Sequence, residues 1–167
     1  MDLAEVVRSA VETSRPLLDA ARHQLAVSLP AETLTLECDP LRLAQVLSNL
    51  LNNAAKFTEK GGQVWLDARR EGSSAIVSIR DSGMGIPAEM LPKVFDLFTQ
   101  VDRTYSRAEQ GLGIGLTLVS RLVDMHGGSV EARSDGPGKG SEFILRLPLA
   151  RGRRRRFDPG RRGSPPI

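Results

Sequence analysis

The sequence predicts an α+β protein: a two-layer α/β sandwich in which three helices cover one face of a mixed, mostly antiparallel sheet. Segments with a helical spacing of apolar residues are separated by segments in which apolar and polar residues alternate. The alternating segments include pairs joined by short glycine-containing turns, as expected for hairpins. The chain has 167 residues, of which 40% are hydrophobic and 26% charged, so it can bury a core without disulfides or metals.

Helices are predicted where apolar residues recur at a spacing of three or four. In the first helix, Asp2 is placed to cap the N-terminus and Pro16 to introduce a kink or a break. The second helix opens at Asp39 and Pro40, and the last is stopped by a pair of glycines. The predicted helices cover residues 2–23, 39–57, a short segment near 87–95, and 114–126.

Strands are predicted where apolar and polar residues alternate. Two of them are joined through Glu71 and Gly72, and the last two through the turn D-G-P-G-K-G. The predicted strands cover residues 25–29, 33–38, 63–69, 74–80, 128–133 and 141–148.

Composition excludes several classes of protein. Cys38 is the only cysteine, which excludes a disulfide scaffold and a cysteine zinc cluster. His23 and His126 are the only histidines and lie far apart in the sequence, so a histidine-rich metal site is not expected. No apolar run approaches the roughly 20 residues that span a bilayer, and the acidic N-terminus does not resemble a secretion signal.

Charge is distributed unevenly along the chain. The overall net charge is +3, but residues 151–167 alone carry +6 and residues 1–150 carry −3. Affinity for nucleic acid would therefore depend on this arginine-rich tail alone. Charge runs that are rich in glycine and proline and lack apolar periodicity are usually solvated linkers, so we favour a linker over a nucleic-acid-binding arm.

The helix at 39–57 carries polar residues that its apolar stripe does not explain. Asn49 and Asn53 are four residues apart and share a face, and Lys56 follows one turn after Asn53. Asparagine is unfavourable inside a helix because its amide competes for the backbone. One explanation is an exposed polar surface, and Asn52 needs no other. The alternative is a face turned to a ligand, with an amide oxygen for a metal and an ammonium for phosphate.

Three glycine-rich segments are further candidates for ligand contact. D-S-G-M-G-I-P, from Asp81, follows a strand directly, so its backbone can approach a flat ligand while the carboxylate accepts a hydrogen bond from an amine. G-L-G-I-G-L, from Gly111, opens a helix and presents N–H groups to an anion, although no G-K-[ST] of a Walker motif follows. G-K-G-S-E-F, from Gly138, enters the last strand. Each segment alone also fits an ordinary turn.

Taken in order, these segments resemble the ATP-binding catalytic domain of sensor histidine kinases. That domain has the Bergerat fold shared with gyrase, the ninety-kilodalton heat-shock chaperone and mismatch-repair ATPases. The resemblance covers about residues 1–149. N-L-L-N-N-A-A-K-F-T resembles the family's N box, D-S-G-M-G-I and G-L-G-I-G-L its glycine boxes, V-F-D-L-F-T-Q its phenylalanine box, and G-K-G-S-E-F its closing glycine turn.

The resemblance implies a role for each matching position. Asn53 would coordinate a Mg²⁺ ion that bridges the ATP phosphates, and Asn49 would support the same site. Asp81 would bind the adenine amino group, Lys56 would contact phosphate or ribose, and Ser141 would join the polar network near adenine. The glycines of the first box, Gly83 and Gly85, would make room for the base. Those of the second box, Gly111, Gly113 and Gly115, would serve the phosphates.

Residues 99–112 correspond in this resemblance to the ATP lid. Arg103 and Arg107 would reach the γ-phosphate when the lid closes, and Phe95 and Phe98 would anchor its base. Core packing is the alternative explanation for the two phenylalanines.

Asn49 also separates the branches of the superfamily. The hydrolysing ATPases carry a glutamate there as the base that activates water, and an amide cannot act as a base. Phosphoryl transfer to a protein side chain is therefore favoured over hydrolysis. The acceptor motif of histidine kinases, H-E-x-R-T-P, is absent, and neither His23 nor His126 has its neighbours. We expect a catalytic fragment that binds Mg-ATP but does not phosphorylate itself. A self-sufficient ATPase and a non-catalytic nucleotide-binding module are the alternatives.

The expected organisation is an ATP-binding domain at 1–149, followed at 150–167 by a basic tail or linker that we expect to be disordered. The expected partners are a phosphoacceptor histidine hairpin domain and, downstream, a response-regulator receiver. We expect a monomeric fragment of a homodimeric parent, a cytoplasmic location, and neither membrane contact nor nucleic-acid binding from this chain.

Overall fold

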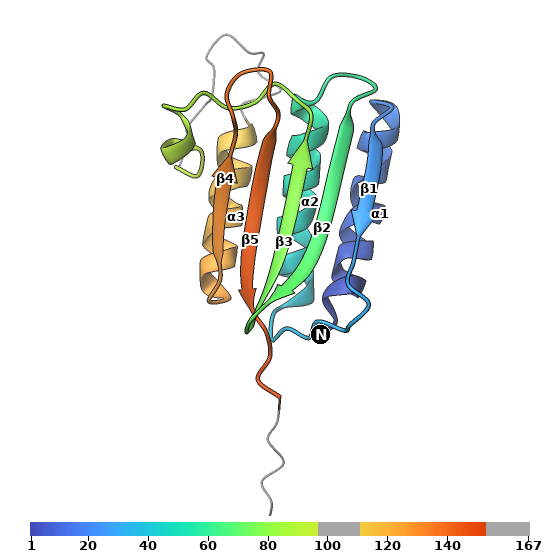
Figure 1. Cartoon of the computed structure of the whole chain (residues 1–167), viewed down its shortest axis with the longest axis vertical. Helices are drawn as coiled ribbons and strands as arrows, with labels where there is room; N and C mark the ends of the chain where they lie inside the picture. Colours follow the sequence, from blue (N-terminus) through green and yellow to red (C-terminus); the bar gives the residue numbers. More distant parts are fainter. Residues whose placement is uncertain (97–110, 153–167) are drawn as a thin grey trace, which may run out of the picture.

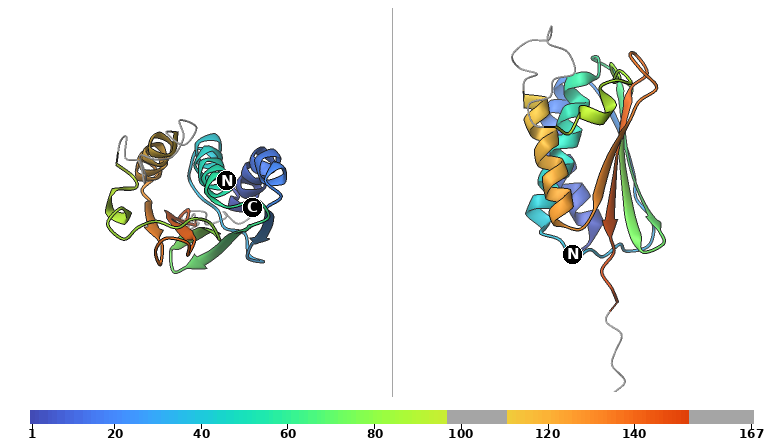
Figure 2. Two further views of the ribbon diagram at one scale, coloured as in Figure 1. Left: turned by 90° about the horizontal axis from the view of Figure 1, so that it is seen from above. Right: turned by 90° about the vertical axis from the view of Figure 1, so that its left-hand side faces the viewer.

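The computed structural model describes residues 1–96 and 111–152. Within them, an open five-stranded sheet is covered on one face by three helices, which confirms the predicted α/β sandwich (Figures 1 and 2). In chain order the elements are α1 (Leu3–Ala20), β1 (Gln24–Ser28), α2 (Pro40–Phe57), β2 (Gln63–Glu71), β3 (Ser74–Asp81), the 3₁₀ helix η1 (Leu91–Lys93), α3 (Gly111–Met125), β4 (Ser129–Arg133) and β5 (Ser141–Pro148). Each helix of the described ranges is too short or too polar to span a bilayer.

The strands lie in the order β1-β2-β3-β5-β4. β1 pairs with β2 in parallel, and the other neighbouring pairs are antiparallel. The register pairs Asp81, at the end of β3, with Ser141, at the start of β5, and with Val64 of β2. The end of β3, the start of β2 and the β4–β5 connection therefore meet at one end of the sheet (Figure 1).

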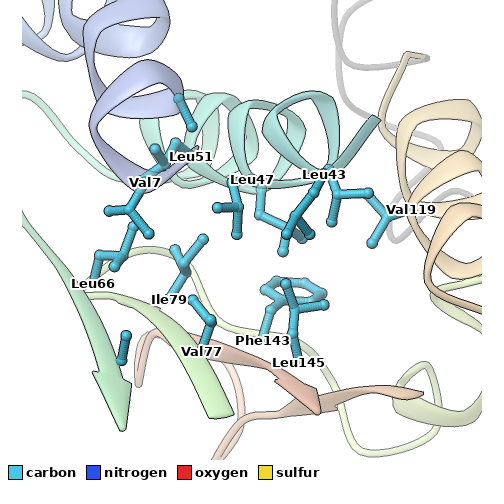
Figure 3. Close-up of a cluster of buried hydrophobic side chains, with 14 of the residues drawn as sticks. Val7, Leu43, Leu47, Leu51, Leu66, Val77, Ile79, Val119, Phe143 and Leu145 are labelled. Carbon is cyan, nitrogen blue, oxygen red and sulfur yellow. The ribbon is translucent and has the colours of Figure 1, made fainter. Parts of the chain in front are cut away.

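The hydrophobic core fills the space between the helices and the inner face of the sheet. Figure 3 shows side chains from α1, α2 and α3 meeting alternate residues of the strands. The labelled members of this core are Val7, Leu43, Leu47, Leu51, Leu66, Val77, Ile79, Val119, Phe143 and Leu145, all of them buried. Asn53 is buried with the apolar face of α2, so the helix carries a polar group into the edge of the core.

Local signals define the starts of the helices. The side chain of Asp2 accepts a hydrogen bond from the N–H of Ala4, and that of Asp39 accepts one from the N–H of Leu41, each at 3.0 Å. These contacts satisfy N–H groups that the first turn of a helix leaves without partners. The break considered at Pro16 does not occur, because α1 continues past it as one helix.

Three predicted elements differ from the structure. Residues 33–38 form two isolated bridges, Asp2 with Thr35 and Leu36 with Leu149, instead of a strand. The two bridges go to different partners, so no ladder can propagate along the segment. The helix near 87–95 is reduced to the three residues of η1, and α3 begins at Gly111, so the second glycine box lies inside the helix rather than before it.

Arg22, between α1 and β1, has a φ of 54° and is the only non-glycine residue of the described ranges with a positive φ. A non-glycine residue at this positive φ destabilises the folded state by roughly 1–2 kcal/mol. Glycine removes this strain, but its greater freedom in the unfolded chain offsets part of the gain in stability. We therefore expect Arg22→Gly to raise the free energy of unfolding by about 0.5–1 kcal/mol in urea denaturation.

Arg8→Gly, at an exposed position inside α1, is the matched control for this prediction. It should lower the free energy of unfolding by about 1 kcal/mol, because its backbone is helical. Destabilisation of the same size by both substitutions would show that Arg22 is not strained.

Candidate functional site

A pocket opens at the end of the sheet where β3 ends and β5 begins. It encloses about 430 Å³, its open mouth included. The lining residues come from α2, the segment after β3, α3 and β5, and they are Asn53, Phe57, Asp81, Met84, Gly85, Ile86, Val94, Leu116, Ser141 and Phe143. Most of these side chains are apolar and three are polar, which is the usual composition of a site for a small organic ligand.

Asp81 is the buried carboxylate of this pocket, with 6% of its surface exposed. Its Oδ1 accepts a hydrogen bond from the N–H of Gly83 at 2.8 Å, and its Oδ2 accepts one from the hydroxyl of Ser141 at 2.7 Å. Each carboxylate oxygen has a second lone pair. Asp81 is therefore fixed by the protein and can still accept a hydrogen bond from an N–H group of a ligand.

Burial raises the pKa of Asp81 above its ordinary value of 3.8, because desolvation disfavours the charged form. The hydrogen bonds from Ser141 and Gly83 act in the opposite direction, since they stabilise the carboxylate. Burying such a group lowers stability, and an ionisable group perturbed in this way inside a pocket is characteristic of a functional site.

Gly83 and Gly85 are required by the close approach of neighbouring backbone. A Cβ at Gly83 would lie 2.2 Å from the carbonyl oxygen of Phe57, and one at Gly85 would lie 2.1 Å from the carbonyl oxygen of Gly136. Gly85 also has a φ of +73°, which disfavours other residues. The resemblance assigns these glycines to the space around a base. The structure adds that they let the loop after β3 pack against both the end of α2 and the β4–β5 connection.

Ser134 belongs to no motif and was not predicted as a site residue. Its hydroxyl accepts a hydrogen bond from the N–H of Ile86 at 3.0 Å and donates one to the carbonyl oxygen of Gly140 at 2.7 Å. A further hydrogen bond between the same two segments runs from the N–H of Gly138 to the carbonyl oxygen of Met84 at 2.7 Å. The only signal in the sequence is a serine between a strand and a glycine-rich turn, where hydroxyls often bond to the backbone.

α2 brings one of its three predicted residues into the pocket. Asn53 is 7% exposed, and its Nδ2 has no hydrogen-bond partner among the described residues. Buried polar groups are nearly always paired, so an orphaned amide at a pocket wall points to a ligand. Asn49 is half-buried and Lys56 is exposed, and neither lines the pocket. Asn52 does not line it either, although its Oδ1 is buried without a partner rather than exposed as expected.

The amide of Asn53 fits a magnesium ligand, because its oxygen is the kind of donor that Mg²⁺ prefers and the amide can turn to present it. In the part of the chain that the structure describes, no cluster of three or more His, Cys, Asp or Glu could hold a metal alone. A Mg²⁺ ion at Asn53 would therefore take most of its oxygen ligands from phosphate and water.

The second glycine box forms the start of α3, with Gly111, Gly113 and Gly115 in its first two turns. The first N–H groups of a helix have no partners within it, and the helix dipole favours an anion there. Among the described residues, no atom lies within 4 Å of the position that a Cβ at Gly115 would take, and the next residue, Leu116, lines the pocket. The start of α3 thus lies beside the pocket.

Phe95 packs against the pocket wall, with its ring edge-to-face with that of Phe143 at a centroid distance of 6.1 Å. The carbonyl oxygen of Phe95 accepts a hydrogen bond from the hydroxyl of Thr117 in α3 at 3.1 Å. Residues 97–110 lie outside the described ranges, and with them most of the expected lid at 99–112, Phe98, Arg103 and Arg107.

Neither histidine lines the pocket. His126 connects α3 to α2: its Nδ1 lies 2.6 Å from the carbonyl oxygen of Leu122, and its Nε2 accepts the N–H of Asp39 at 3.2 Å. This contact is at the N-terminus of α2, whereas the pocket lies near its C-terminus. His23 is buried near the C-terminus of α2, where its Nε2 contacts two carbonyl groups.

The arrangement can bind a ligand with two chemically different parts. A flat ring with an amino group matches the apolar walls and the acceptor Asp81. An anionic part with a bound cation matches the amide of Asn53 and the start of α3.

Comparison with known proteins gives a consistent result. Residues 38–151 match the family described as Histidine kinase-, DNA gyrase B-, and HSP90-like ATPase. The alginate biosynthesis sensor protein KinB of Pseudomonas aeruginosa is 35% identical over 148 residues, which cover 89% of this chain and 24% of KinB. The sensor histidine kinase RcsC of Escherichia coli is 43% identical over 120 residues, which cover 72% of this chain and 12% of RcsC. The chain thus spans less than a quarter of the length of either relative.

Solved structures agree with these relatives. The mycobacterial sensor histidine kinase MprB superposes with a TM-score of 0.80 at 26% identity, covering 91% of this chain and 99% of that chain. Full-length ShkA, solved in complex with AMPPNP, gives a TM-score of 0.78 at 30% identity over 91% of this chain and 31% of that one. The histidine kinase ThkA, solved in complex with the response regulator protein TrrA, gives 0.75 at 25% identity over 90% of this chain and 41% of that one.

The raised pKa of Asp81 predicts how stability depends on pH. The folded state holds the Asp81 proton more tightly than the unfolded state does, so the stability linked to this proton is present below pH 3.8 and is lost as the pH rises through the raised pKa. Asp81→Asn removes this dependence. Its free energy of unfolding relative to wild type should therefore increase with pH across this window and then level off.

Chemical denaturation at a series of pH values measures this difference. Asp135→Asn, which replaces an exposed carboxylate in the β4–β5 connection, is the control for the change of charge. A difference for Asp81→Asn that falls with rising pH would mean that the carboxylate is stabilised rather than penalised by its surroundings.

Proposed function

Because the chain belongs to the family of histidine kinase-, DNA gyrase B- and HSP90-like ATPases, we propose that it binds Mg-ATP and donates the γ-phosphate to a histidine on a separate domain. Its relatives are sensor histidine kinases, so the chain contains the catalytic ATPase domain of a phosphotransferase family. In this proposal it is the nucleotide-binding module of a longer two-component sensor kinase.

The observation that carries the proposal is the buried carboxylate of Asp81 in an otherwise apolar pocket. The exocyclic amine of adenine is a donor, and a carboxylate held by Gly83 and Ser141 is an acceptor of fixed direction. The apolar walls would take the faces of the base. Gly85 would keep the backbone close enough for this contact.

The phosphates would lie between α2 and the start of α3. N–H groups at Gly111 and Gly113 would face them, Gly115 would leave space beside them because it has no side chain, and Lys56 would reach them or the ribose from the end of α2. Asn53 would be the protein's ligand to Mg²⁺, with Asn49 in support. Bound Mg²⁺ would neutralise charge on the transferred phosphoryl group.

The residues around the pocket position the nucleotide rather than activate water. Asn49, one turn before Asn53, is an amide and cannot take a proton from water. Transfer then depends on orientation and charge stabilisation, with any base supplied by the acceptor domain. An amide at this position favours phosphoryl transfer over hydrolysis by the chain itself.

The organisation of the parent protein is part of the proposal. We place the ATP-binding domain at 1–149 and a basic linker at 150–167. ThkA was solved in complex with a response regulator protein, which supports a response-regulator receiver as the downstream partner here. The phosphoacceptor hairpin, the dimeric parent and the cytoplasmic location follow from the same kinase role.

Asp81→Asn tests the adenine contact. The substitution keeps the shape of the side chain but weakens its acceptor, and the loss of a charge-assisted hydrogen bond should lower ATP affinity about ten- to a hundredfold. Isothermal titration calorimetry measures the change, with Asp135→Asn as the charge-matched control. Unchanged ATP affinity in Asp81→Asn would remove the adenine assignment.

Asn53→Ala tests the metal contact. The variant should bind ATP with the same affinity with and without Mg²⁺, because the protein's own ligand to the ion is gone. Asn52→Ala is the control, since Asn52 is adjacent on α2 but does not line the pocket, and it should keep the enhancement by Mg²⁺. Coincident Mg²⁺ titrations of wild type and Asn53→Ala would contradict the assignment.

A further inference from the structure

His23 is a buried polar residue that the proposed function does not use. Its side chain is 7% exposed, and it does not line the pocket. Its Nε2 lies 3.0 Å from the carbonyl oxygens of both Thr58 and Glu59. Carbonyl oxygens can only accept, so Nε2 carries a proton and donates it to them.

The first carbonyl group caps α2, and the second belongs to the residue that follows the cap. Thr58 is the C-cap of this helix, and a helix C-terminus leaves carbonyl groups without partners inside the helix. A donor from elsewhere in the chain therefore completes the helix end, as basic side chains often do. His23 lies 35 residues before Thr58, so the contact holds the α1–β1 connection onto the end of α2.

The backbone on either side reinforces this contact. The N–H of Gly61 donates to a carbonyl oxygen at the end of α1 at 2.9 Å. The N–H of Gln24 donates to a carbonyl oxygen in the turn before β2 at 3.0 Å. Arg22 takes up its positive φ directly before His23. Strained backbone of this kind is retained where the surrounding structure fixes it, often beside a functional group.

The same end of α2 contacts the pocket from its other side. The carbonyl oxygen of Phe57 accepts the N–H of Met84 at 2.9 Å, and Phe57 itself lines the pocket. That carbonyl also occupies the space that a Cβ at Gly83 would need. A shift in the end of α2 would therefore move the turn in which the N–H of Gly83 holds the carboxylate of Asp81.

We propose that His23 is a positioning residue for the nucleotide pocket: its Nε2 donor holds the last turn of α2 against the loop that follows Asp81. The inference rests on the proposed function for the identity of the ligand, which is Mg-ATP. His23 acts through Phe57 and Met84 and does not itself touch the nucleotide.

The test measures the affinity of the full 167-residue chain for Mg-ATP by calorimetry. His23→Leu keeps the apolar bulk and removes the donor, and it should weaken ATP binding about three- to tenfold. His23→Gln places an amide N–H close to the position of Nε2 and should restore the affinity to within about twofold of wild type. If His23→Leu does not fold, His23→Asn replaces it with the same expected loss, because its amide is too short to reach both carbonyl groups.

Val6→Ala separates positioning from general stability. Val6 is buried in the first turns of α1, and its truncation destabilises the protein by leaving a cavity. The native state remains the dominant species, so ATP affinity should not change in this control. Equal loss of ATP affinity in His23→Leu, His23→Gln and Val6→Ala would show that His23 contributes only to general stability and would overturn the inference.

Amide exchange at Met84 gives a second readout that needs no nucleotide. Under native conditions the N–H of Met84 should exchange about fivefold faster in His23→Leu than in wild type and should be restored in His23→Gln. An unchanged value of either readout in His23→Leu overturns the inference. If the wild-type chain binds no ATP, the proposed function fails, and the exchange at Met84 still decides whether His23 positions this loop.

Discussion

The burial of one carboxylate constrains the whole pocket end of the molecule. Two charged oxygens removed from water need compensating hydrogen bonds, and Asp81 receives one from the turn that follows it and one from the neighbouring strand. These bonds require the pairing of Asp81 with Ser141, and they require backbone to pass very close to β3. A Cβ at Gly140 would lie 2.1 Å from the carbonyl oxygen of Asp81. The strand register and the glycine turns therefore both serve to hold the buried carboxylate of Asp81.

The segments around the carboxylate are joined by backbone contacts rather than by side-chain packing alone. The loop after β3 is bonded to the end of α2 through Met84 and Phe57, and to the β4–β5 connection through Gly138 and Ser134. These hydrogen bonds fix the backbone around the polar site within the apolar wall of the pocket. The cost is lower stability at the site, a common exchange where a buried polar group is kept for binding.

The elements specified by nearby residues could be predicted from the sequence. α2 begins where Asp39 supplies the cap, and the β2–β3 hairpin turns at Gly72, because both signals act within a few residues. The strand expected at 33–38 could not be excluded in this way, since its bridges go to distant segments. The same limit applies to the site. Ser134 was missed because its importance depends on which loop faces it, and the packing reason for Gly83 appears only when the end of α2 is in place.

The proposed adenine site depends on a hydrogen bond from an exocyclic amine to Asp81, and a comparison of two nucleotides on the wild-type chain tests this bond most directly. Inosine triphosphate carries a carbonyl oxygen in place of that amine and a proton on the neighbouring ring atom N1, so an acceptor would face Asp81 at the position of the amine in a buried site. If the amine of adenine bonds to Asp81, inosine triphosphate should bind about a hundredfold more weakly than ATP in calorimetry at identical Mg²⁺ concentrations. Equal affinities for the two nucleotides would contradict it.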